Sequence, residues 1–172
     1  MGTLKHTLFA EAADRHVFFV PNRRINLDWL LQNPAKLLPE GVFDALPDIA
    51  KYDLAEAGKC IAYSVPTGAA FHILRASEAV LRDYYCRIIH RNRVAPLTWG
   101  AITADFKKHR TKPSAEILEN LDYIRRNFRN PTSHPEARFD LEEAQRLFQL
   151  CIDAIARIIS DPLWTKSTAP CT

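Results

Sequence analysis

The stretch TGAAFHILRASEAVLRDYY, residues 67–85, decides the fold because it predicts a helix that is apolar on most sides. Its apolar residues do not follow one narrow stripe; they surround the helix and include Phe71, Leu74, Val80 and Tyr84. A helix of this kind is covered by neighbouring elements on several sides. We therefore predict a central helix over about residues 68–91, with the rest of the fold packed around it.

The segments on both sides of this helix also have helical periodicity. From Asp48 onward, apolar residues recur at spacings of four, three and four, which predicts a first helix that ends at the turn SVPTG, residues 64–68. Ser64 or Thr67 is the candidate N-cap of the central helix. Four or five helices joined by short loops predict an all-α fold, an antiparallel bundle.

Three further helices are predicted after the central one, and each has a polar start signal. Thr98 and Ser114 are candidate N-caps of two of them. Asp140 precedes the last helix, with Glu143 three residues later, which is the spacing of a capping box.

The two ends of the chain differ from this helical core. Residues 1–47 contain several prolines and the apolar run HVFFVP, residues 16–21, which could be a strand. They predict a short irregular N-terminal arm packed on the bundle. We assign residues 48–162 to the bundle and residues 163–172 to a flexible C-terminal tail, so the 172 residues form one domain.

Composition narrows the classes of function. The formal net charge of +3 is mildly basic, and its local basic clusters fit either phosphate binding or solvated helix ends. Cys60, Cys86 and Cys151 lie in apolar helical patterns and form no C-x-x-C pair, so we expect free buried thiols, a reduced cytoplasmic location and no metal site. Residues 1–16 lack a continuous apolar run, so we expect no secretory signal there, and because no apolar run reaches membrane-spanning length, no membrane partner is expected.

The central helix carries one line of polar side chains. His72, Arg75, Glu78 and Arg82 recur at helical spacing. This line could be the solvent face of the helix, held by Arg75–Glu78 and Glu78–Arg82 ion pairs. Because the line is narrow, it could instead be a polar seam that faces another polar surface.

A candidate partner for this seam is the run RNPTSH, residues 129–134. Pro131 disfavours helix at the residue before it, so we expect Arg129 at the end of its helix and His134 in the connection that follows. A guanidinium can hold a phosphate and offset developing charge. An imidazole can take a proton from a ribose 2′-hydroxyl or give one to a leaving oxygen. The spacing alone is weak, because it recurs by chance in many chains.

Together with residues 52–62, 67–85 and 124–149, this run resembles the HEPN superfamily of small helical-bundle domains. The family signature is an arginine, usually followed by a polar residue, and a histidine four to six residues later, which matches Arg129, Asn130 and His134. The resemblance implies a metal-independent endoribonuclease that needs no cofactor. It also implies a homodimer in which two such motifs face one cleft.

The resemblance also implies roles for particular residues. Arg129 and His134 would be catalytic, supported by an Arg-x-x-Glu element that matches Arg75 and Glu78. The RNA backbone would be met by Asn130 and by the flanking Arg125 and Arg126. Some toxin members have a tyrosine two residues after the histidine, where this chain has Glu136, and this difference argues against that subgroup.

Three functions are therefore open. The first is a ribonuclease that cleaves RNA through the 2′-hydroxyl, in a toxin–antitoxin or phage-defence system with an antitoxin or another defence-system protein as partner. The second is an inactive helical module that dimerises and binds a protein or a nucleotide, in which the polar set fixes the bundle register. The third, a DNA-binding helical protein, ranks last because no helix-turn-helix with a basic helix is recognisable.

Overall fold

The computed structural model describes residues 20–89, 94–132, 134 and 136–165, and within them every regular element is helical. This confirms the predicted all-α bundle. No helix among the described residues has both the length and the apolar character needed to cross a membrane. The suggested strand at residues 16–21 lies largely outside the described residues, and Val20 and Pro21 belong to no strand.

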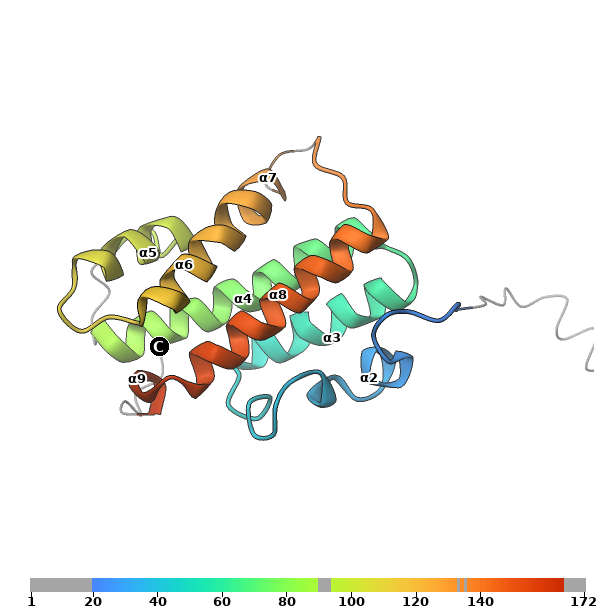
Figure 1. Ribbon diagram of the computed structural model, residues 1–172, viewed down its shortest axis with the longest axis horizontal. Coiled ribbons are helices and arrows are strands. Elements are labelled where there is room, and N and C mark those ends of the chain that lie inside the picture. The colour runs from blue at the N-terminus through green and yellow to red at the C-terminus, as the bar shows by residue number, and fades with distance from the viewer. Residues whose placement is uncertain (1–19, 90–93, 133, 135, 166–172) are drawn as a thin grey trace, which may run out of the picture.

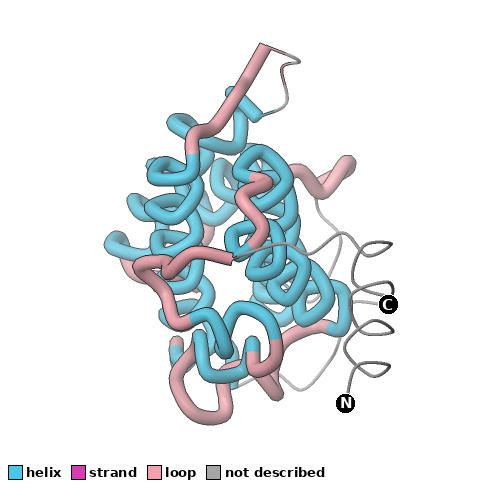
Figure 2. Tube along the Cα trace, turned by 90° about the vertical axis from the view of Figure 1, so that its right-hand side faces the viewer, coloured by secondary structure: helices cyan, strands magenta, loops and turns pink. Residues whose placement is uncertain are grey.

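The centre of the bundle is α4 (Pro66–Ile89), and α3 (Asp48–Ala62), α5 (Trp99–Lys108) and α8 (Leu141–Ser160) pack against it (Figure 1). Figure 2, turned by 90° from Figure 1, shows helices of the bundle lying side by side. Side chains on several faces of α4 are fully buried, among them Ile73, Leu81, Tyr84 and Tyr85. The prediction of a central helix from its all-round apolar pattern is confirmed.

The start of α4 differs from the prediction. The helix begins at Pro66, so neither Ser64 nor Thr67 occupies the N-cap position. A proline suits the first helical position because the N–H that it lacks would have had no partner within the helix. Ser64 has φ of 60° and belongs to the turn between α3 and α4.

The later helices begin at the predicted caps. Thr98 and Ser114 each accept a hydrogen bond from a backbone N–H in the first turn of α5 and of α6 (Ala115–Ile124), at 3.4 and 3.3 Å. Asp140 and Glu143 form the predicted capping box at the start of α8. These side chains satisfy N–H groups that a helix leaves without backbone partners.

The described part of the N-terminal arm packs on α3 and contains two short helices that we did not predict. They are α2 (Leu27–Leu31) and the 3₁₀-helix η1 (Pro34–Leu37). Leu30 is 1% exposed, and its carbonyl oxygen would lie 2.7 Å from a Cβ at Gly58, so only glycine allows this approach. Arg23 donates hydrogen bonds to the carbonyls of the last two residues of α3, at 3.1 and 2.9 Å.

The bundle also extends into the segment predicted as a flexible tail. After α8, the short helix α9 (Pro162–Thr165) places Trp164 on the bundle, where it is 5% exposed. The guanidinium of Arg87 lies 4.2 Å from the centre of its ring. Burial of the large indole ring holds this segment on the bundle. The prediction of a flexible tail that begins at residue 163 was therefore wrong for residues 163–165. Residues 166–172 lie outside the described residues.

The cysteines agree with the sequence in part. Cys60 and Cys151 are free, and Cys151 is fully buried. Cys86 is disulfide-bonded, so the expectation of a free thiol there was wrong.

Candidate functional site

The helix that carries the motif arginine continues past it. After α6 the chain forms a π-helical turn, η2 (Arg125–Arg129), and then a last helical turn, α7 (Asn130–Thr132). Pro131 has no N–H to donate. In the π-helical turn the N–H of Asn130 donates to the carbonyl of Arg125, five residues earlier, and the Thr132 hydroxyl donates to the carbonyl of Phe128 at 2.6 Å. These bonds carry the helix through the proline, so the prediction that it ends at Arg129 was wrong.

From η2, Arg129 reaches the polar line of α4 and pairs with Glu78. Its Nε and Nη2 both lie 3.3 Å from Oε2 of Glu78. The other carboxylate oxygen, Oε1, accepts a hydrogen bond from Nη2 of Arg82 at 2.8 Å. Glu78 therefore holds two guanidinium groups together, one from its own helix and one from the motif.

Arg75 does not pair with Glu78, contrary to the expectation for a solvent face, but with Asp53 on α3. Its Nε lies 3.3 Å from Oδ2 of Asp53, and Nδ1 of His72 lies 2.8 Å from Oδ1. Asp53 is 0% exposed. Its Oδ2 has no hydrogen-bond partner, so the contact with Arg75 is an ion pair without hydrogen-bond alignment.

Asp53 was missed by sequence reasoning, although one signal was available. It lies on the apolar stripe of its helix, among Ala50, Leu54 and Ala57. A carboxylate on the buried face of a helix is almost never left without a partner. The partners could not be read from the sequence, because only the packing of α3 on α4 brings them near.

These ion pairs meet where two hollows adjoin. The larger is an open groove of about 700 Å³ along α4, and the smaller, of about 120 Å³, lies between α4 and the motif. Arg75, Glu78 and Arg129 line both hollows. Thr132 also lines the smaller hollow.

The larger groove combines charge with an apolar wall. It is lined by four arginines and three carboxylates: Arg75, Arg82, Arg87, Arg129, Asp53, Glu78 and Asp83. Each carboxylate pairs with an arginine, as Asp83 does with Arg87 at 3.0 Å. The wall includes Leu46, Ile49 and Leu97. Such a groove can accept a ligand that carries both a negative charge and an apolar ring.

His134 lies apart from this junction. It is exposed and lines neither hollow. Its backbone N–H donates to the carbonyl of Pro131 at 2.9 Å, and its carbonyl accepts from the N–H of Ala137 at 3.1 Å, so the chain turns at this residue. The structure thus brings Arg75, Glu78 and Arg129 together and leaves His134 on the loop two residues beyond Thr132.

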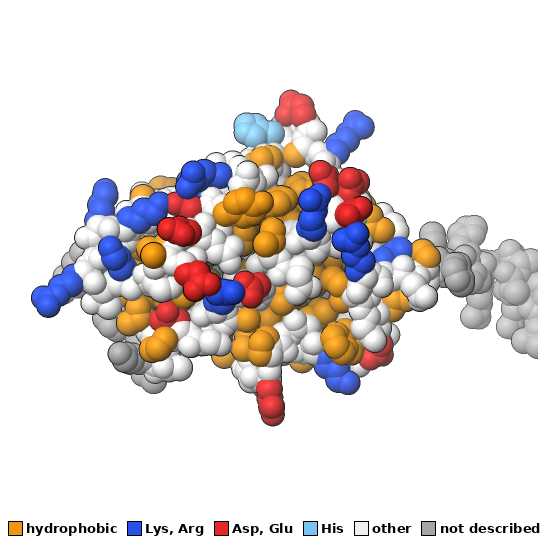
Figure 3. Space-filling model, viewed as in Figure 1, with side chains coloured by type: hydrophobic (Ala, Val, Ile, Leu, Met, Phe, Trp, Pro, Cys, Tyr) orange, Lys and Arg blue, Asp and Glu red, His pale blue; other side chains and the backbone are white. Residues whose placement is uncertain are grey.

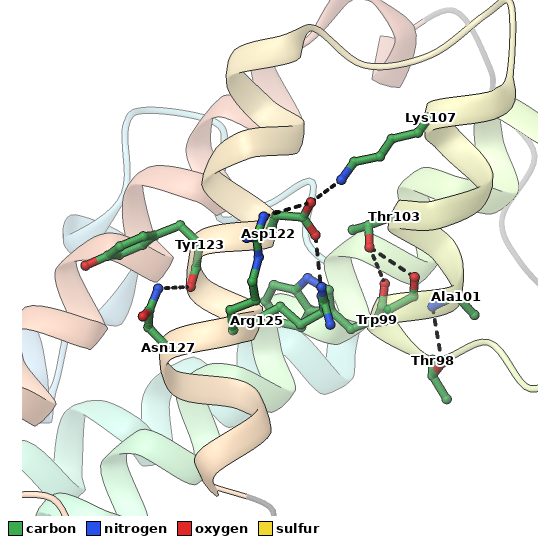
Figure 4. Close-up of polar contacts among 11 residues, drawn as sticks. Thr98, Trp99, Ala101, Thr103, Lys107, Asp122, Tyr123, Arg125 and Asn127 are labelled. Atoms are coloured by element: carbon green, nitrogen blue, oxygen red, sulfur yellow. Dashed lines mark hydrogen bonds and ion pairs between the residues drawn. The ribbon is translucent and has the colours of Figure 1, made fainter.

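Two of the residues predicted to bind RNA, Arg125 and Arg126, belong to another cluster, centred on Asp122. Figure 4 shows Arg125 and Lys107 on either side of this carboxylate. Nε of Arg125 donates to Oδ1 of Asp122 at 3.4 Å, and Nη2 of Arg126 lies 3.6 Å from Oδ2. Lys107 of α5 pairs with the same carboxylate. Neither arginine lines the hollows beside Glu78, and Asn130 is exposed outside them.

The Asp122 cluster joins α6 to α5 electrostatically. Asp122 is only 4% exposed. Burial raises the pKa of its carboxyl, but the hydrogen bond and charge of Lys107, followed by those of Arg125, outweigh burial and lower the pKa. The carboxylate therefore stays ionised and holds its cations in place.

On the face of the molecule shown in Figure 3, basic and acidic side chains are interspersed around hydrophobic patches. Within the described part of the chain, no group of three or more His, Cys, Asp or Glu is placed to hold a metal ion. The fold and site define a helical bundle with an arginine-lined groove. No protein-family model, curated protein or solved structure matches the chain.

Proposed function

We propose that this protein is a metal-independent endoribonuclease of HEPN type, which acts as a homodimer and cleaves RNA through the 2′-hydroxyl. One observation carries the proposal: Arg129 lines the same two adjoining hollows as Arg75 and Glu78 of α4, although it follows Glu78 by 51 residues in the sequence. The resemblance of the motif to HEPN domains supplies the class of reaction. It also suggests a cytoplasmic toxin–antitoxin or phage-defence setting, with an antitoxin or another defence-system protein as partner.

In this proposal the smaller hollow receives the scissile phosphate. Arg75 and Arg129 line it with side chains that are 45% and 35% exposed, so a phosphate there would contact both guanidinium groups. Glu78 forms an ion pair with Arg129, and Asp53 forms one with Arg75. Guanidinium groups fixed before the substrate arrives stabilise the charge that develops on the phosphate oxygens.

His134 would supply an imidazole for proton transfer. It is exposed on the loop after α7, where RNA can reach it. The 2′ oxygen attacks the adjacent phosphorus and the bond to the 5′ oxygen breaks, which leaves a 2′,3′-cyclic phosphate and a 5′-hydroxyl. This chemistry needs proton transfer and charge stabilisation from side chains and no metal ion.

The RNA backbone beyond the cleaved bond would be met by exposed polar groups outside the hollows. Arg126 has 66% of its side chain exposed, and Asn130 is also exposed, so both can contact RNA. Arg125 is 26% exposed, and we expect it to act mainly through the field of the Asp122 cluster. Because phosphate contacts release counterions, RNA affinity would fall steeply with salt.

One observation favours the second candidate, an inactive module that dimerises and binds a protein or a nucleotide. Glu78 and Asp53 pair with the arginines of the junction, and His134 lines neither of the two hollows there. In such a module the ion pairs would fix how α3, α4 and η2 pack. The module would bind its ligand without cleaving RNA.

The test is an RNA cleavage assay in EDTA on a panel of RNAs, with His134→Ala and matched DNA oligonucleotides beside the wild type. We expect the wild type to cut RNA and not DNA, because DNA lacks the 2′-hydroxyl. His134→Ala should lower the rate at least about 100-fold, the scale of a lost proton-transfer group. An absolute need for a divalent metal, or equal cleavage of DNA, would contradict the mechanism.

A further inference from the structure

His72 on α4 and Asp53 on α3 form a carboxylate–imidazole pair, and His72 adjoins in sequence Phe71, which lines the smaller hollow, although His72 itself lines neither hollow. Nδ1 of His72 lies 2.8 Å from Oδ1 of Asp53, whose side chain is 0% exposed. An ionised carboxylate only accepts hydrogen bonds, so the proton lies on Nδ1 of the imidazole. In the tautomer that donates from Nδ1, the basic lone pair of the ring is on Nε2.

The position of His72 makes Nε2 accessible. The side chain of His72 is 23% exposed, and because Nδ1 points to a buried carboxylate, we infer that the exposed edge of the ring is the one that carries Nε2. Within the described residues Nε2 has no hydrogen-bond partner. The adjacent Phe71 and Arg75 line the smaller hollow together with Arg129.

The proposed reaction needs two proton transfers, whereas the motif contains one histidine. One group must take the proton of the 2′-hydroxyl, and another must give a proton to the 5′ oxygen as it leaves. An imidazole oriented by a buried carboxylate is suited to the first task, because the carboxylate fixes the tautomer and stabilises the imidazolium that forms.

We propose that His72 is the general base of the ribonuclease reaction, with Asp53 as its positioning residue; this inference rests on the proposed function. Nε2 of His72 takes the 2′-hydroxyl proton as the 2′ oxygen bonds to phosphorus. The bond from phosphorus to the 5′ oxygen breaks, and that oxygen takes a proton from His134. Solvent then restores the two histidines to their starting states.

The charged groups near His72 come from α3 and from its own helix, α4. Asp53 on α3 contacts it directly, and Arg75 on α4 lies 3.3 Å from the other oxygen of the same carboxylate. The guanidinium of Arg75 stacks over Phe71 at 5.6 Å, and that ring stands edge-on to the imidazole at 5.8 Å. Asp53 is the group in hydrogen-bond contact, so its charge acts on the imidazole more strongly than that of Arg75.

His72→Asn separates proton transfer from packing. The amide nitrogen of asparagine lies near the place of Nδ1 and can donate to Asp53, but nothing replaces Nε2. We expect kcat in EDTA to fall at least about 100-fold. The melting temperature should change by no more than about 3 °C, because the bond between α3 and α4 is kept. As a matched control, His109→Asn at the end of α5 should leave kcat unchanged.

The pH profile gives a second readout that a structural role would not move. In the wild type, kcat/KM should rise with pH on the acid side, as the base loses its proton, and fall on the alkaline side, as the acid loses its own. His72→Asn should abolish the acid-side rise, and His134→Ala the alkaline-side fall. If His72→Asn does not fold, as judged by circular dichroism, the same measurements are made on His72→Gln, whose longer amide can also reach Asp53.

The outcomes distinguish this inference from the proposed function. A wild type that cleaves RNA, beside a folded His72→Asn whose kcat lies within about threefold and whose pH profile is the same, would overturn the role of His72 and leave the ribonuclease proposal standing. A wild type that cleaves no RNA in the panel would overturn both. Loss of kcat together with the acid-side limb, in a folded variant, supports the inference.

Discussion

Glu78 accepts hydrogen bonds from Arg82 through one carboxylate oxygen and from Arg129 through the other. Its side chain is 13% exposed, so water screens these pairs less than it screens pairs at the surface. One carboxylate thus sets the position of an arginine on α4 and of the motif arginine on η2. Removal of its charge would leave two guanidinium groups close together without their counter-ion.

Glu78→Gln is therefore expected to lower the free energy of unfolding by about 1–3 kcal/mol, the scale for a half-buried charge network that loses one partner. Urea unfolding followed by circular dichroism measures this. Glu142→Gln is the matched control, because Glu142 and its partner Arg24 are 64% and 65% exposed. The control should change the free energy of unfolding by less than about 0.5 kcal/mol. Equal effects of the two variants would show that Glu78 does not hold the junction.

Asp122 gives the protein a defined acid sensitivity. Burial raises its pKa, but Lys107 and Arg125 together lower the pKa by more than burial raises it. The folded-state pKa therefore lies below the ordinary value of 3.8. A lowered carboxyl pKa adds stability that is fully present above the unfolded-state value and is lost as the pH falls through the folded-state value. The contribution should thus be constant near neutral pH, begin to shrink near pH 3.8, and be lost once the pH falls below the folded-state pKa.

Asp122→Asn tests this directly. The difference in unfolding free energy between wild type and variant should be constant from about pH 5 to pH 8 and shrink as the pH falls below the ordinary aspartate pKa. Urea unfolding at a series of pH values measures the difference. A difference that stays the same down to about pH 2 would contradict the assignment of the lowered pKa to Asp122.

At the scale of elements, the contact between α2 and α3 depends on one glycine. A Cβ at Gly58 would lie 2.7 Å from the carbonyl oxygen of Leu30, and a backbone atom cannot move aside without shifting α2. A Cβ at Gly100 in α5 would meet only side-chain atoms of Arg125 at 3.7 Å, which is ordinary contact. Gly58 in α3 and Gly100 in α5 therefore form a matched pair.

Gly58→Ala is expected to lower the free energy of unfolding by about 1–3 kcal/mol, as overpacking does. Gly100→Ala should raise it by up to about 1 kcal/mol, because alanine favours helix. Thermal and urea unfolding of the two variants measure both effects. Changes of the same sign would mean that the close approach of α2 to α3 does not need glycine.

The sequence predicted the helices better than it predicted where their side chains meet. Periodicity and capping residues depend on neighbours within one helix, so α4, α8 and the capping box at Asp140 could be read from the chain. The end of the motif helix could not, because the proline rule takes no account of a π-turn or of the Thr132 hydroxyl. Likewise, the pairing of Asp53 with His72 and Arg75 depends on the packing of two helices.

At the scale of the whole molecule, the proposed reaction would take place at the junction of the two hollows. Around the face seen in Figure 3, positive charge is interspersed with negative charge, so RNA would be held by a few well-placed arginines more than by a broad basic field. A homodimer would bring two such junctions to one cleft, as the resemblance to HEPN domains implies. The proposed ribonuclease function therefore depends most on Arg129.

The most direct measurement is the initial rate of RNA cleavage in EDTA by the wild type, Arg129→Ala and Arg138→Ala, with analysis of the RNA ends. Arg138 is the control, an exposed arginine that follows the motif in the chain and lines neither hollow. We predict cyclic phosphate ends, a loss of at least about 100-fold for Arg129→Ala and less than about threefold for Arg138→Ala. Equal rates for the two variants, or ends without a cyclic phosphate, would contradict the account.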